Sequence, residues 1–218
     1  MQNENKLTDG KIYEKNDMVK LECGECEGCF SCCQGMGDSV TLNPYDIWQL
    51  EINLHKSFAE LLQDQLELGI SEGVIVPNLK MSGIQETCGF LNENGRCSIH
   101  AFRPGICRLF PLGRQYDEEK IGYIFLEHAC PKPNKTKVKI KKWLGIPQLE
   151  ANEAFLLHWH AIQKKVQQLA KVEDKDTVQE LNMYLLNLFF TESYREDFYT
   201  EFEKRAQMAE KLLEKLKE

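Results

Sequence analysis

Nine cysteines, divided between two blocks, constrain the fold of this chain more than any other feature. The first block lies near the N-terminus and contains Cys23, Cys26, Cys29, Cys32 and Cys33. The second block is spread through the middle of the chain and contains Cys88, Cys97, Cys107 and Cys130. Because residues 34–87 contain no cysteine, a site that uses both blocks has to be assembled by folding, so metal binding and folding would be linked.

The composition disfavours a disulfide framework and a nucleic-acid partner. The polar N-terminal segment has no apolar core of a secretory signal, and no run of eighteen apolar residues predicts a transmembrane helix. We therefore expect a cytoplasmic protein without a membrane span, in which disulfides are rare and an odd number of cysteines cannot all pair. The net charge of −7 disfavours a nucleic-acid binder. Because cysteines in a reducing compartment more often bind metal, we expect metal ions as partners.

The spacing of the first block suits several kinds of metal or redox site. Cys26, Cys29 and Cys32 have the Cys-x2-Cys-x2-Cys spacing that begins the bacterial ferredoxin run. The next ligand of that run would fall on Met36, although a Cys-Pro pair occurs later, at Cys130. Cys-x2-Cys is also the usual half of a zinc site. It is the spacing of a thioredoxin-type redox dithiol as well, but the βαβ pattern that accompanies such a motif is not present around it. We expect an iron–sulfur cluster, with zinc as the second choice.

The adjacent pair Cys32 and Cys33 is unusual for a mononuclear site. Because adjacent side chains diverge, these thiols are better suited to two neighbouring metals, or to one ligand and one packed thiol. His100 follows Cys97 at x2 spacing, but with so many thiols at hand we expect it, and His128, to be a packed or exposed histidine rather than a metal ligand.

Arginines cluster beside the second block. Arg103 precedes Cys107, and Arg108 and Arg114 follow it. Such arginines can offset the charge of a thiolate cluster or bind an anionic group of a substrate, and they can equally anchor loops through backbone carbonyls. We predict a cofactor-binding role for Arg103.

Patterns along the chain predict an α+β fold. Asn43 and Pro44 mark one helix start, and Ser57 with Glu60 marks a second helix, which we expect to end at Gly69. Residues 74–77 read as a short strand stopped by a proline, and two hairpins are expected within residues 88–100 and 113–127. The lysine-rich residues 132–142 suggest an edge strand or a solvated linker.

The chain beyond Pro147 has the periodicity of amphipathic helices. Three apolar stripes predict three packed helices, whose central residues are Trp159, Leu185 and Phe202. We therefore divide the chain into a flexible lead-in (1–20), a cysteine-cluster domain of short hairpins and helices (21–146) and a helical C-terminal subdomain (147–218).

The two cysteine blocks resemble a known family. The segments CEGCFSCC and CGFLNENGRCSIHAFRPGICRLFP, followed by Cys130, are similar to the YkgJ-type cysteine-cluster family over residues 23–131. That family is described as zinc- or iron-chelating and includes flagellin lysine N-methylases. The resemblance implies that the metal ligands are Cys26, Cys29, Cys32, Cys33, Cys88, Cys97, Cys107 and Cys130, with Cys23 outside the pattern.

The resulting prediction is a metal-binding protein in which eight cysteines hold an iron–sulfur cluster or zinc. Two other functions stay open at this point. One is a protein lysine N-methylase-like enzyme acting on a flagellin-type protein substrate, although no nucleotide-type glycine-rich loop is present for the methyl donor. The other is metal storage or delivery, for which exposed thiolates would be the sign.

Overall fold

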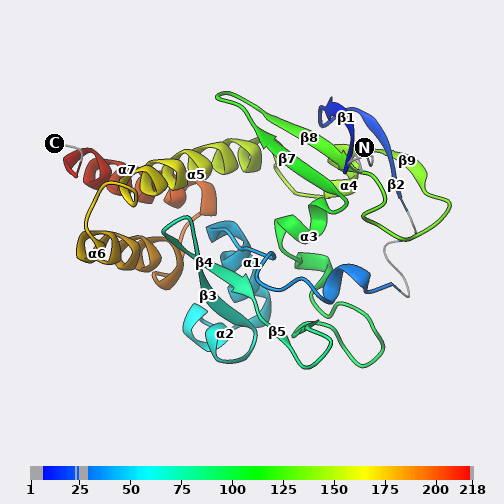
Figure 1. Ribbon diagram of the computed structural model, residues 1–218, viewed down its shortest axis with the longest axis horizontal. Coiled ribbons are helices and arrows are strands. Elements are labelled where there is room, and N and C mark those ends of the chain that lie inside the picture. Colours follow the sequence, from blue (N-terminus) through cyan, green and yellow to red (C-terminus); the bar gives the residue numbers. More distant parts are fainter. Residues whose placement is uncertain (1–6, 23, 25–28, 217–218) are drawn as a thin grey trace, which may run out of the picture.

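The computed structural model describes residues 7–22, 24 and 29–216 and confirms the α+β class (Figure 1). Its helices are α1 (Pro44–Leu54), α2 (Phe58–Asp64), α3 (Gly105–Leu109), α4 (Ile140–Leu144), α5 (Leu149–Leu169), α6 (Lys175–Leu186) and α7 (Phe198–Lys215). Three short helical turns are η1 (Ser31–Cys33), η2 (His100–Phe102) and η3 (Asn187–Thr191). No helix within these described residues has the length and apolar character needed to cross a membrane.

The strands are short and pair only in antiparallel fashion. They are β1 (Thr8–Tyr13), β2 (Met18–Glu22), β3 (Leu66–Ser71), β4 (Val74–Leu79), β5 (Met81–Ser82), β6 (Thr87–Cys88), β7 (Leu112–Tyr116), β8 (Ile121–Leu126) and β9 (Thr136–Lys139). Strands β1, β8 and β7 form one sheet in that order, and β2–β9, β3–β4 and β5–β6 form two-stranded ribbons. In Figure 1, α5, α6 and α7 gather on one side of the molecule, and the three-stranded sheet and β2–β9 lie on the other.

Helices α1 and α2 begin where the sequence predicts. The Asn43 side chain accepts from the Asp46 backbone N–H at 3.0 Å, and the Asp46 carboxylate accepts from the Asn43 N–H at 3.1 Å. Ser57 and Glu60 form the same reciprocal pair at the start of α2. Because each capping box satisfies two otherwise orphan N–H donors, both starts are fixed locally.

The end of α2 differs from the prediction. The helix stops at Asp64, and Gly69 lies in β3, opposite Val76 of β4. Pro77 does not end its strand either, because β4 continues to Leu79, and its carbonyl accepts from the Leu42 N–H at 2.8 Å. Pairing with the next strand therefore overrides the helical pattern of residues 65–69.

Residues 8–22 also differ from the expected lead-in, because they form two strands. Tyr13 of β1 pairs with Tyr123 of β8, and Val19 of β2 pairs with Val138 of β9. Both partners come from far along the chain, so a local pattern gives little sign of them. The edge-strand interpretation of the lysine-rich segment is confirmed by β9, and the division of the chain into domains remains a prediction.

The three C-terminal helices bury the predicted apolar stripes and share one core with the rest of the protein. The stripe of α5 is fully buried and consists of Phe155, Trp159, Ile162, Val166 and Leu169. Aromatic rings join α1 to α7, with the centroids of Trp48 and Phe198 5.3 Å apart. The buried Asn182 of α6 accepts from the Ile75 N–H at 2.9 Å and so ties the helices to β4.

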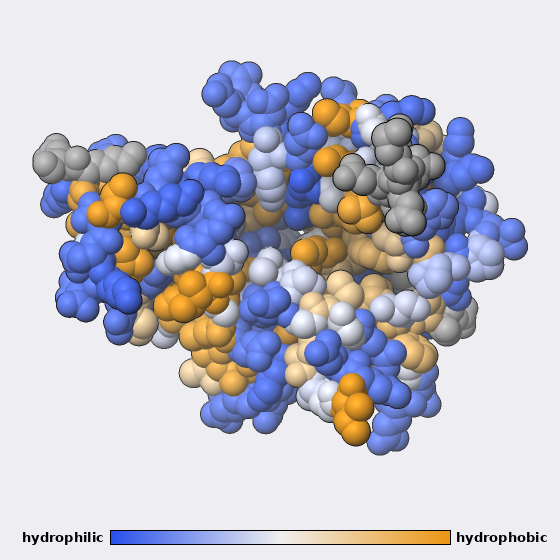
Figure 2. Space-filling view, in the orientation of Figure 1, coloured by the Kyte–Doolittle hydropathy of each residue, from blue (hydrophilic) through white to orange (hydrophobic). Residues whose placement is uncertain are grey.

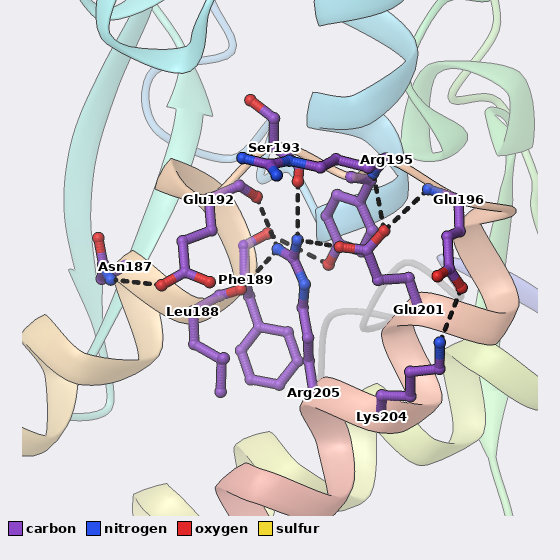
Figure 3. A network of polar contacts seen from close by, with 11 residues as sticks. Asn187, Leu188, Phe189, Glu192, Ser193, Arg195, Glu196, Glu201, Lys204 and Arg205 are labelled. Carbon is purple, nitrogen blue, oxygen red and sulfur yellow. Dashed lines mark hydrogen bonds and ion pairs between the residues drawn. The ribbon is translucent and has the colours of Figure 1, made fainter.

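A buried arginine holds the connection between η3 and α7 (Figure 3). The Arg205 guanidinium is 6% exposed and donates to the carbonyls of Leu188 (2.7 Å), Glu192 (2.6 Å) and Ser193 (2.9 Å). It also pairs with the Glu201 carboxylate and lies 3.9 Å from the centroid of the Tyr194 ring. One side chain therefore satisfies the carbonyls at the end of η3.

We predict that Arg205→Leu lowers the free energy of unfolding by about 3 kcal/mol, because it leaves a partly buried carboxylate and several carbonyls without their donor. Urea denaturation measures this loss. Lys204→Ala is the matched control, since the neighbouring Lys204–Glu196 pair is exposed and should contribute almost nothing. Equal effects of the two substitutions would contradict the structural role of Arg205.

Candidate metal centre

The described part of the first cysteine block lies beside β6. Turn η1 carries Cys32 and Cys33, and directly after it the Gly35 N–H donates to the Glu86 carbonyl at 3.0 Å. The intervening Gln34 forms a bridge with Thr87. Since β6 ends at Cys88, these backbone contacts bring the two blocks together across a long stretch of sequence.

A tight loop positions Cys97. The Asn92 N–H donates to the Arg96 carbonyl at 2.9 Å, and a bridge between Leu91 and Cys97 closes the turn. The hairpin-like turn predicted around NENG is therefore present, as an isolated bridge rather than as two strands. At Gly95 (φ +67°) a Cβ would lie 2.9 Å from the Phe30 ring, so the glycine allows this loop to contact the first block.

Helix α3 carries Cys107 and is held by a carboxylate of α1. Asp46 is 4% exposed, and its Oδ1 accepts from the Gly105 N–H at 2.7 Å. The Arg108 Nε donates to the Arg103 carbonyl at 3.0 Å, which matches the loop-anchoring interpretation of this arginine. Arg103 itself donates to the His100 carbonyl at 2.8 Å.

Six of the eight predicted ligands line one cavity of about 690 Å³: Cys29, Cys32, Cys33, Cys88, Cys97 and Cys107. Arg103 and His100 line the same cavity. Figure 2 shows the surface hollowed near its middle, with hydrophobic residues beside the hollow. Cys88 is buried and the other five thiols are intermediate in exposure.

The two remaining predicted ligands have different outcomes. Cys130 is absent from the cavity wall, and its carbonyl accepts from the Lys135 ammonium at 2.7 Å. Cys26 lies outside the described residues, as does Cys23. Within the described part of the chain, no three His, Cys, Asp or Glu side chains lie close enough together to hold one metal ion.

The cavity environment favours the protonated form of several thiols. Burial raises the pKa of Cys88, of Cys97 and of Cys107, and the nearby Asp46 adds to the effect on Cys107. The exception is Cys32, whose pKa is lowered because Cys33 donates a hydrogen bond to it and Arg103 is nearby. The same contact raises the pKa of Cys33.

The other described histidines do not line the cavity. His128 is exposed, His158 pairs with Glu203, and His160 stacks on Tyr116 with ring centroids 4.1 Å apart.

The sequence did not reveal that α5 forms part of the cavity wall. Leu156, Trp159, Gln163 and Gln167 all face the cavity, as does Arg114 of β7. The four α5 residues follow one another at three- and four-residue steps, which an ordinary core stripe also shows. Only the tertiary structure reveals that this face lines a cavity. Nor does the local sequence around Asp46 indicate that its carboxylate holds α3.

A comparison with protein families matches residues 25–137 to the CxxCxxCC family, described as a "putative zinc- or iron-chelating domain". Neither the curated proteins nor the solved structures searched gave a significant match. The matched segment contains all six cavity-lining cysteines as well as Cys26 and Cys130. Since it spans more than half of the 218 residues, the chain belongs to the CxxCxxCC family of zinc- or iron-chelating domains, the YkgJ-type family that its cysteine blocks resemble.

Proposed function

We propose that the cysteines bind a polynuclear iron–sulfur centre inside the protein. The observation that supports this proposal best is the shared cavity, in which six thiols from two distant blocks face the same space. A single zinc ion takes four ligands, so six thiols exceed its needs. With Cys26 and Cys130 added, eight thiolates suffice for two four-cysteine centres or for one larger cluster.

The donor set fits such a group chemically. Thiolates are the usual ligands of iron–sulfur clusters, and the triple spacing of Cys26, Cys29 and Cys32 is the start of a ferredoxin run. A bound cluster would supply one-electron transfer or a rigid structural link. Arg103 lines the same cavity, and we assign it the role of offsetting the negative charge of the thiolates.

Metal binding would also complete the folding of this region. Burial keeps several thiols protonated, so binding has to displace protons and draw the side chains together. A delivery protein needs thiolates that are exposed to its partner. The buried or half-buried thiols of this cavity favour a resident centre over storage or delivery.

Purification without oxygen should yield iron with a matching amount of acid-labile sulfide. Cys33→Ser and Cys107→Ser should each lose most of that iron, because both thiols face the cavity, whereas Cys23→Ser should retain it. Cys130→Ser should lose iron as well if the eight-ligand set is right. Zinc without sulfide would contradict the iron–sulfur centre and indicate a zinc site instead. A chain that holds neither metal, even after reconstitution, would overturn metal binding altogether.

Asp46 should control the metal centre through the position of α3. We expect Asp46→Leu to lower the free energy of unfolding of the metal-free protein by about 1–3 kcal/mol, since the Gly105 N–H loses its acceptor. It should also reduce the bound iron, because α3 carries Cys107. Asp46→Asn keeps an acceptor oxygen and is the control; thermal unfolding and iron content measure both effects. Full iron content in Asp46→Leu would show that the contact does not matter for the site.

A further inference from the structure

The cavity extends beyond the thiols to a wall that no metal ligand occupies. Leu156 and Trp159 of α5 and Val74 and Val76 of β4 line this end. No cysteine lies on either element, so this end is not needed to bind metal. The volume of about 690 Å³ is in the range of small-molecule sites, which are about 300–1,000 Å³ and mostly apolar.

Arg114 adds one polar group without a partner. It lies on β7 and lines both this cavity and an adjoining one of about 180 Å³. Its Nε is buried and has no hydrogen-bond partner, and the guanidinium forms no ion pair with any residue that the structure describes. Arg103 and Arg108, in contrast, donate to backbone carbonyls.

The neighbouring Asp46 does not satisfy Arg114. The two oxygens of Asp46 accept from the backbone N–H groups of Gly105 and Asn43, and no Asp46–Arg114 pair lies within 4.0 Å. A buried donor without an acceptor is costly, and a charged one more so. The guanidinium is therefore suited to an acceptor that comes from outside the chain.

We propose that this cavity binds a small carboxylate with an apolar body. The planar guanidinium of Arg114 donates to the carboxylate, and the apolar body lies against Leu156 and Trp159. A single negative charge fits better than a phosphate dianion, because Arg114 is the one described arginine of this cavity with a buried nitrogen that lacks a partner, and the Asp46 carboxyl is nearby. The residues that would bind this ligand belong to β7 and α5, and none of them is a proposed metal ligand.

Titration calorimetry with octanoate tests the charged end of the site, with metal content measured on the same samples. Octanoate should bind with saturation at one site per chain, and Arg114→Gln should weaken it about tenfold or more. Arg195→Gln, at an exposed and distant arginine, is the matched control and should bind like the unaltered chain. 1-Octanol should bind more weakly and should not respond to Arg114→Gln.

A second pair of variants tests the apolar end. Gln163→Phe places a larger side chain at the cavity wall and should weaken octanoate binding, whereas Gln168→Phe, exposed on the same helix, should not. If Arg114→Gln does not fold, Arg114→Lys, which keeps the charge but loses the planar fork, should still bind octanoate more weakly than the unaltered chain.

The proposal is overturned by a lack of saturable octanoate binding, by equal affinity for 1-octanol, or by tighter binding of octyl phosphate. It is also overturned if Arg195→Gln weakens binding as much as Arg114→Gln. Because Arg114 is not a proposed metal ligand, unchanged iron in Arg114→Gln separates this result from any failure of the metal centre.

Discussion

The buried carboxylate of Asp46 is the contact on which the arrangement around the cavity depends. It closes the capping box of α1 through Asn43 and accepts from the first N–H of α3, which carries Cys107. One side chain therefore fixes both a helix start and the position of a thiol from the second block. Burial raises the pKa of Asp46, and the two N–H donors oppose that rise by stabilising the ionised form.

The cavity combines three kinds of group that proteins usually keep apart. Thiols from distant segments share it with a partly unsatisfied arginine and with an apolar helix face. Without bound partners these groups destabilise the folded state, since burial disfavours both unpaired thiolates and unpaired guanidinium groups. A resident metal centre would satisfy the thiols, and an anionic ligand would satisfy Arg114. The metal and the anion would thus satisfy different groups of the same cavity.

Local sequence signals predicted local structure well. The starts of α1 and α2, the turn between β7 and β8 and the buried faces of α5, α6 and α7 all follow from neighbouring residues. Failures occurred where a distant segment decides the outcome. Strands β1 and β2 form by pairing with β8 and β9, which lie more than a hundred residues away. The β3 error is different, because β3 pairs with the neighbouring β4 and this pairing overrides a local helical pattern. The cysteine blocks indicated metal chemistry because the spacing within each block is a local signal. The role of α5 in the cavity depends instead on packing that no local spacing encodes.

The order of these elements along the chain has a consequence for how the protein is made. All nine cysteines precede α5, which supplies one wall of the cavity. During synthesis the N-terminal part of a chain emerges first, so the thiols leave the ribosome before this wall exists. The thiols are therefore exposed to solvent, metal ions and oxidants during synthesis until α5 docks and completes the cavity wall.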